Sequence, residues 1–200
     1  MDRKFLIGSG VAAVAILALI YKMKSASAGA AAPLVAGSKI LLVGDSLAVG
    51  LTARMKTLAE AAGYGFASQA IVGTRSDQWA PKMDALLAQE TPGLVLISLG
   101  TNDATTNKPE AQAPYFASIA ASVAAGGGRL IWIGMPTLPA RIAGQDVVRA
   151  IVDGVGPEVI DSRAMSFYRA SDEIHSSPQG YASWADQIWA DLRNRGVVGA

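Results

Sequence analysis

The 200-residue sequence has no cysteine, a single histidine and few charged residues. Without cysteine there is no disulfide framework and no cysteine-ligated zinc or iron–sulfur site, and one histidine argues against a metal site built from several histidines. The formal net charge is only +1, which gives no electrostatic case for binding nucleic acid. With 51% apolar residues, the composition also excludes an intrinsically disordered chain.

One long apolar run is present, and it lies at the N-terminus. Residues 5–21 contain no charge and have two basic residues on each side. At about 1.5 Å per residue the run would be about 25 Å long, near the lower limit for crossing a hydrocarbon core of about 30 Å. We favour an uncleaved single-pass anchor that leaves the rest of the chain outside the cytoplasm, because Lys22 and Lys24 separate the run from a cleavage site. The alternative is a secretory signal peptide that is cleaved near Ala28.

The sequence predicts three segments: an anchor or signal peptide at 1–24, a flexible linker of small residues at 25–37, and a globular domain at 38–200. In the last segment, short apolar runs alternate with longer amphipathic ones. This alternation predicts a parallel sheet with helices on both faces, a three-layer α/β/α arrangement of the flavodoxin-like type with five strands. The expected strands are 39–43, 66–72, 94–99, 129–134 and 158–161, and the expected helices are 48–62, 76–89, 114–125, 142–155 and 178–195.

Polar residues with catalytic potential follow several of these strands. Ser46 comes after the first strand and opens a helix, whereas Asp172 and His175 lie in a loop before the last helix. Ligand sites of doubly wound sheets lie beyond the carboxyl ends of the strands. A serine needs a base to become a nucleophile, and that base needs an acceptor to orient it. We therefore expect Ser46 as nucleophile, His175 as base and Asp172 as the orienting carboxylate.

Three groups are expected to stabilise a developing oxyanion. They are the backbone N–H of Ser46, the backbone N–H of Gly73 after the second strand, and the side-chain amide of Asn102 after the third strand. A glycine at this place lets the backbone approach a substrate closely, because it has no Cβ.

These residues resemble the sequence blocks of the SGNH (GDSL-type) hydrolases, and the resemblance extends over residues 39–195. The blocks are Gly-Asp-Ser-Leu at 44–47, Gly73, Gly-Thr-Asn-Asp at 100–103, and Asp-x-x-His at 172–175. Four blocks in the expected order, each at a strand end or before the last helix, are far more specific than one tetrapeptide. The second block departs from the family pattern, because no further glycine follows Gly73. The resemblance implies the family's fold and an ester hydrolase that works through an acyl-enzyme without metal or organic cofactor.

The predicted function is therefore that of a membrane-tethered serine esterase. Its expected substrates are short acyl or acetyl esters of cell-envelope glycans, or lysophospholipids or thioesters; nucleic acid is not expected as a partner. Two alternatives stay open: a catalytically silent SGNH-like attachment or structural module of an envelope or particle, and an acyltransferase that uses the same triad.

Four further residues lie near these blocks, and their expected roles differ. Arg75 is either a candidate substrate-binding residue or a solvated side chain, and Trp79 either lines the substrate pocket or packs in the core. Asp45 is expected to be structural. Asp103 is expected to be a turn residue or a structural partner of the first block.

Overall fold

The computed structural model describes residues 32–156 and 158–199. The predicted anchor and most of the linker, 1–31, lie outside these residues. Among the helices of the described ranges, none is both long and apolar enough to cross a membrane.

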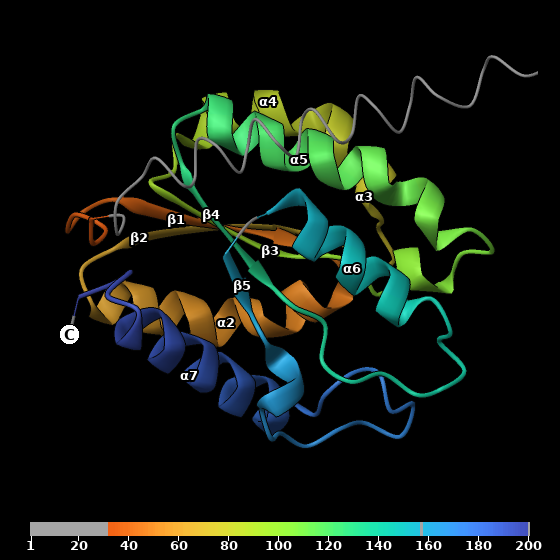
Figure 1. The fold of residues 1–200 in the computed structure, drawn as a ribbon. Coiled ribbons are helices and arrows are strands. Elements are labelled where there is room, and N and C mark those ends of the chain that lie inside the picture. Colours follow the sequence, from red (N-terminus) through yellow and green to blue (C-terminus); the bar gives the residue numbers. More distant parts are fainter. Residues whose placement is uncertain (1–31, 157, 200) are drawn as a thin grey trace, which may run out of the picture.

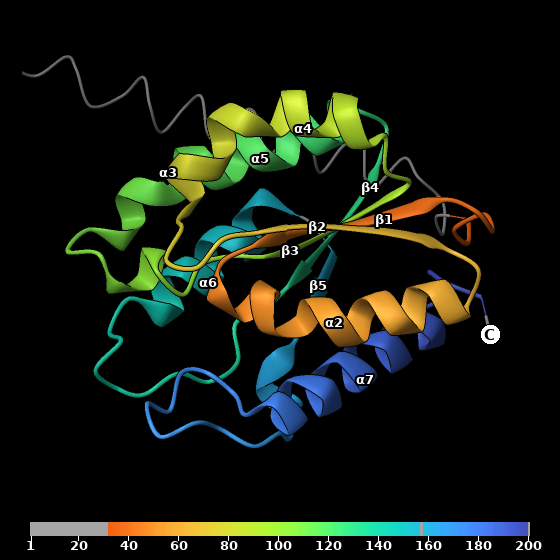
Figure 2. The same cartoon turned by 180° about the vertical axis from the view of Figure 1, so that it is seen from behind.

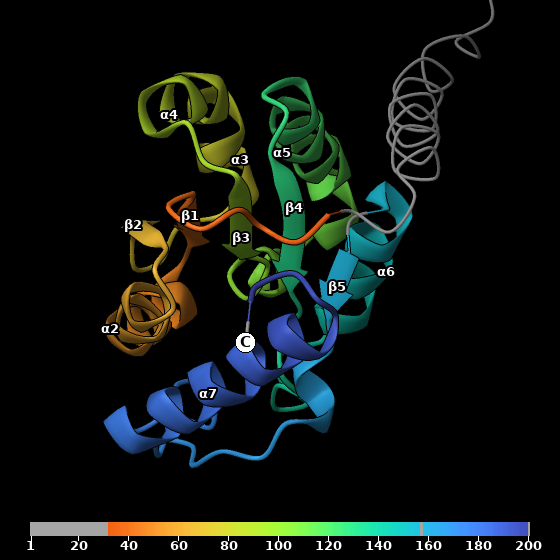
Figure 3. The ribbon, with the colours of Figure 1, turned by 90° about the vertical axis from the view of Figure 1, so that its left-hand side faces the viewer.

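Five parallel strands form one sheet with the order β2-β1-β3-β4-β5. In Figure 3 this order runs across the view, with β2 at one edge of the sheet and β5 at the other. This is the flavodoxin-like order, in which the chain reverses its direction of winding between β1 and β3. The strands are β1 (Lys39–Gly44), β2 (Gly65–Ala70), β3 (Leu94–Ser98), β4 (Arg129–Ile133) and β5 (Glu158–Ile160).

Helices cover both faces of the sheet (Figures 1 and 2), because the central strands bury apolar side chains on both sides. In β1, Leu41 and Val43 pack in one cluster, whereas Ile40 and Leu42 pack in the other. The first cluster is completed by α3 (Ser76–Trp79), α4 (Met83–Glu90), α5 (Ala113–Ala125) and α6 (Gln145–Val155), and the second by α2 (Ser46–Ala61) and α7 (Pro178–Asn194).

The five-stranded α/β/α prediction is confirmed, with one helix in need of correction. The helix expected at 76–89 is interrupted, because Ala80–Lys82 forms a 3-10 turn between α3 and α4. Pro81 lies in this turn, and a proline ring excludes the backbone N–H that a continuous helix needs. The strand expected at 66–72 ends earlier, at Ala70, and the short 3-10 turns Asp103–Thr105, Pro109–Gln112 and Ser162–Ala164 were not anticipated.

Candidate active site

Ser46 is the first residue of α2, directly beyond the carboxyl end of β1. The neighbouring Asp45 is the helix N-cap, and its Oδ1 accepts a hydrogen bond from the Leu47 N–H at 2.9 Å. Because Asp45 caps the helix, the Ser46 hydroxyl is free for another partner. A Cβ at Gly44 would collide with the backbone oxygen of Ser98 at the end of β3, so a glycine is needed where these strand ends converge.

Asp172 and His175 lie in a tight turn between β5 and α7. Oδ1 of Asp172 accepts hydrogen bonds from the backbone N–H groups of Ile174 and His175, both at 2.9 Å. This is an Asx-type turn, in which a carboxylate organises the chain that follows it. Glu173, inside the turn, has a left-handed φ of 60°. The carboxylate of Asp172 therefore fixes the backbone of the turn and also binds the imidazole ring of His175.

The structure brings the three predicted triad residues into one hydrogen-bonded chain. The distance between His175 Nδ1 and Asp172 Oδ2 is 2.6 Å, and that between His175 Nε2 and Ser46 Oγ is 2.8 Å. With the proton on Nδ1, the ring donates to Asp172 and accepts the hydroxyl hydrogen of Ser46. The hydrogen bond from His175, with the two backbone N–H groups, lowers the pKa of Asp172 to about 2. Asp172 is thus ionised wherever a histidine base would work.

The predicted oxyanion donors lie on adjacent strand ends. Asn102 follows β3 at the start of a 3-10 turn, and its Nδ2 donates to the Thr74 backbone oxygen at 3.0 Å. This bond ties the third block to the segment directly after Gly73. The amide has a second N–H for another acceptor. Gly73 has a φ of +78°, a left-handed value that favours glycine, and no atom crowds its Cβ position within 4 Å.

Two buried carboxylates underlie the site. Asp45 and Asp103 are both fully buried. Burial raises the pKa of Asp45 to about 7, and the nearby charge of Asp103 adds to this shift. Burial also raises the pKa of Asp103, opposed by hydrogen bonds from the hydroxyl of Ser76 at 2.5 Å and from its N–H at 3.1 Å. Asp103 opens the 3-10 turn Asp103–Thr105, which agrees with one of the two predictions for it. Its carboxylate bonds Ser76, three residues after Gly73, and not a residue of the first block.

Two arginines that sequence reasoning missed hold the turn that contains His175. Arg169 donates to the Ile174 oxygen at 2.8 Å and to the Thr137 oxygen at 2.9 Å. Arg141 donates to the Asp172 oxygen and pairs with Glu173 at 2.9 Å. The segment between β4 and α6 is thereby joined to the turn from both sides. The backbone oxygens of Asp172 and Thr137 are more than 30 positions from the arginines that bind them. No local sequence pattern could therefore identify these two arginines.

The two candidate substrate-binding residues have different outcomes. The guanidinium of Arg75 pairs with Asp77 at 3.0 Å and is 39% exposed, so a structural partner holds it near the second block. Trp79 is 4% exposed and lies in the core cluster of the first sheet face, with its indole N–H donating to Thr74 Oγ1 at 2.9 Å. The substrate-pocket interpretation of Trp79 is wrong, because packing against α5 encloses the ring.

The five-stranded flavodoxin-like sheet, with Ser46 beyond β1 in hydrogen-bond contact with His175, places the chain in the SGNH class of hydrolases. Solved structures match 78–89% of the chain, as three of them illustrate. The structure of TesA is 25% identical with a TM-score of 0.62, and the match covers 78% of this chain and 99% of TesA. A GDSL-like lipase from Bacteroides thetaiotaomicron is 17% identical with a TM-score of 0.61, covering 89% and 98% of the two chains. Est24, a carbohydrate acetylesterase from Sinorhizobium meliloti, is 18% identical with a TM-score of 0.65, covering 78% and 99%.

The chain belongs to the family described as a protein of unknown function, DUF459, whose model matches residues 39–150. No curated protein matches the sequence. The SGNH resemblance seen in the sequence is confirmed at the level of family and fold. The matched range ends before Asp172 and His175, so the proposed roles of these two residues rest on their geometry in this chain.

Proposed function

We propose that the protein is a serine esterase that hydrolyses carboxylic esters through Ser46, His175 and Asp172. The observation that carries the proposal is the continuous chain of hydrogen bonds from Ser46 Oγ through the imidazole to Asp172. An isolated histidine on a surface would not be bonded at both ring nitrogens to a serine and a carboxylate. This arrangement is the one that converts a serine into a nucleophile.

The reaction follows from these contacts. His175 Nε2 takes the hydroxyl proton while Ser46 Oγ attacks the ester carbonyl, and Asp172 stabilises the imidazolium that forms. When the tetrahedral intermediate collapses, the ester C–O bond breaks and the leaving alcohol takes the proton from His175. Water then loses a proton to His175 and attacks the acyl carbon. When this second intermediate collapses, the bond between the acyl carbon and Ser46 Oγ breaks, the acid is released, and the proton on His175 returns to Ser46 Oγ.

The oxyanion of each intermediate would be held by the N–H groups of Ser46 and Gly73 and by the amide of Asn102. Ser46 lies at the N-terminus of a 16-residue helix, where the helix dipole stabilises negative charge. Fixed donors of this kind account for a large share of catalysis in acyl transfer.

The substrate is proposed to be an ester with a short acyl group, such as an acetyl ester of an envelope glycan. Three exposed apolar side chains lie on the elements that carry the site: Val49 in the first turn of α2, and Ile71 and Val72 just before Gly73. They offer a small apolar surface for an acyl group. The imidazole of His175 is 40% exposed, which suits a substrate on a polymer or surface. Est24, one of the structural matches, is a carbohydrate acetylesterase.

Membrane tethering through residues 5–21 is part of the proposal, with the catalytic domain on the extracytoplasmic side. Cell fractionation and the intact mass of the mature protein test it. A membrane-bound protein that retains residues 1–28 supports an anchor, and a soluble protein that begins after Ala28 supports a cleaved signal.

The esterase proposal is tested by hydrolysis of nitrophenyl esters of increasing acyl length beside acetylated glycans. Ser46→Ala and His175→Ala should each lower kcat by roughly 10⁴ or more. Ser122→Ala, on α5 and away from the triad, is the matched control and should keep full activity. Full activity in both triad variants would refute the assignment. No hydrolysis by the wild type would favour the silent module, and product that accumulates on an added alcohol faster than hydrolysis would favour an acyltransferase.

A further inference from the structure

Tyr168 is the most exposed large apolar or aromatic side chain in the described part of the protein, with 76% of its surface open to solvent. It lies on the segment between β5 and α7, which also carries His175. A single exposed tyrosine is ordinary on a protein surface. Its position relative to the triad therefore decides whether it has a role.

The segment of Tyr168 pairs with the residues around His175 as a short antiparallel ribbon. Arg169 and Ser176 form its central bridge, and on either side a backbone N–H donates to the oxygens of His175 and Tyr168, at 2.8 and 3.3 Å. Side chains alternate between the two faces of a ribbon, and partners across it share a face. Arg169 and the buried Ser176 thus occupy one face. Tyr168 and His175 lie on the other as diagonal neighbours, close enough for a long side chain to reach the same ligand.

The backbone beside Tyr168 is fixed although its ring is exposed. Phe167 stacks on Trp184 of α7 with 4.9 Å between the ring centroids, and the guanidinium of Arg169 lies 4.7 Å from the centroid of the Phe167 ring. Arg169 also donates to the Thr137 oxygen at 2.9 Å. Both sequence neighbours of Tyr168 are therefore held by the rest of the domain.

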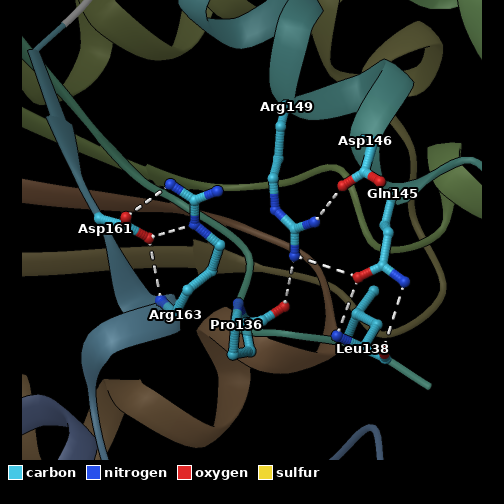
Figure 4. Close-up of polar contacts among 7 residues, drawn as sticks. All are labelled: Pro136, Leu138, Gln145, Asp146, Arg149, Asp161 and Arg163. Carbon is cyan, nitrogen blue, oxygen red and sulfur yellow. Dashed lines mark hydrogen bonds and ion pairs between the residues drawn. The ribbon is translucent and has the colours of Figure 1, made fainter. Parts of the chain in front are cut away.

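Helix α6 in turn holds the segment that Arg169 binds. Figure 4 shows Gln145 and Arg149 reaching the backbone of this segment. Gln145 bonds the N–H and the oxygen of Leu138, at 3.1 and 3.2 Å, and Arg149 donates to the Pro136 oxygen at 3.0 Å. The ribbon thus has a fixed position, and a ring presented from such a support loses little freedom when a ligand stacks on it.

The proton donor of the proposed esterase reaction determines where the two halves of the ester lie, and the inference rests on that proposed function. The imidazolium of His175 gives its proton to the leaving alcohol, so the alcohol half must lie beside His175. The side chains proposed to contact the acyl group are Val49, Ile71 and Val72, on α2 and after β2, and β2 is at the opposite edge of the sheet from β5. The face that His175 shares with Tyr168 is therefore available to the alcohol half.

The exposed ring of Tyr168 suits a sugar better than a lipid chain. The face of an aromatic ring carries partial negative charge and attracts the C–H groups on the face of a pyranose, while the phenol O–H can bond a sugar hydroxyl. A lipid chain needs a larger continuous apolar surface, and no other large apolar side chain between residues 165 and 177 is exposed.

We propose that Tyr168 is a specificity-determining residue of the esterase, and that its ring stacks on a pyranose that carries the acyl group on one of its hydroxyls. The sugar is the alcohol half of the ester and lies beside His175. The acyl group lies toward the end of β2. When the ester C–O bond breaks, the sugar oxygen takes the proton from His175 and leaves as a hydroxyl.

The test compares kcat/KM of the full-length protein in detergent on a monoacetate of methyl xylopyranoside and on ethyl acetate, which has the same acyl group but no ring. Tyr168→Ala should lower kcat/KM on the sugar ester by roughly tenfold, mainly through KM, because it removes a contact that substrate and transition state share. On ethyl acetate the change should stay within about twofold, which also shows that the variant is folded. Tyr168→Phe keeps the ring and should lose less than Tyr168→Ala.

Tyr115→Ala is the matched control, because Tyr115 is also exposed, at 39%, but lies on α5, which carries no triad residue. It should equal the wild type on both esters. Phenyl acetate distinguishes a sugar from an aromatic alcohol. Two aromatic faces repel in direct stacking, so Tyr168→Ala should lose less activity on phenyl acetate than on the sugar ester.

Three results would overturn the role of Tyr168 alone, since the wild type is active in each. They are a Tyr168→Ala variant that matches Tyr115→Ala on the sugar ester, equal losses on the sugar ester and ethyl acetate, and a loss on phenyl acetate as large as that on the sugar ester. A wild type that hydrolyses none of the three esters would refute the esterase proposal, and the role of Tyr168 with it.

Discussion

Replacing Asp45 with asparagine should change how the stability of the protein depends on pH. Asp45 is fully buried beside the nucleophile, and its pKa rises from 3.8 to about 7 on folding, mainly through desolvation. Between these values the folded protein binds a proton that the unfolded chain releases. The free energy of unfolding therefore falls as the pH rises from about 4 to about 7, and the stability contributed by the neutral carboxyl is fully present only below that window.

The magnitude follows from the shift. Going from 3.8 to about 7 at about 1.4 kcal/mol per pH unit gives a loss of roughly 4 kcal/mol between acidic and neutral pH. Asparagine carries no charge, so in Asp45→Asn this loss disappears. Oδ2 of Asp45 has no hydrogen-bond partner among the described residues, so the new amide group would also be unsatisfied. That cost does not vary with pH, and it cancels when the two pH values are compared.

Urea unfolding of wild type and Asp45→Asn at about pH 4 and pH 8 measures the effect. The stability of the variant relative to the wild type should improve by roughly 4 kcal/mol from the lower to the higher pH. Asp186→Asn, which removes a carboxylate that is 47% exposed and paired with Arg54, is the control and should show a far smaller change. An equal pH dependence in wild type and Asp45→Asn would refute the reasoning that a neutral Asp45 lies beside Ser46.

Three other changes test the supports of the site and the packing of α6. Ser76→Ala removes the 2.5 Å hydrogen bond to buried Asp103 and should lower the free energy of unfolding by about 1–3 kcal/mol, measured by urea denaturation. Arg141→Gln releases the backbone oxygen of Asp172; it should lower kcat more than it raises KM and leave the melting temperature nearly unchanged, whereas an unaltered kcat would count against this positioning role. Gly154→Ala fills open space inside α6 and should raise stability by up to about 1 kcal/mol, as thermal unfolding would reveal.

The strands were predictable because burial on both faces demands continuous apolar runs. The expected 94–99 and 129–134 differ from β3 and β4 by one residue at the C-terminal end. The helix expected at 76–89 is divided into α3 and α4 because Pro81, which the sequence prediction did not consider, lies in the 3-10 turn between them.

Within the site, the residues that touch one another were predictable because each follows a strand end or precedes the last helix. The supporting contacts were not. Arg141 and Arg169 bind backbone oxygens of segments that are remote in the sequence. The sequence alone does not distinguish such an arginine from one whose side chain is solvated. The enclosure of Trp79 likewise depends on the packing of α3 against α5, which a single helix does not reveal.

The most direct test of the central claim is the reaction of the full-length protein with a fluorophosphonate, followed by intact mass and peptide mapping. The account predicts one adduct per chain, located at Ser46, no adduct in Ser46→Ala, and a much slower reaction in His175→Ala because the base is missing. An unlabelled wild type, or a Ser46→Ala variant labelled as fast as the wild type, would contradict the assignment of Ser46 as the nucleophile.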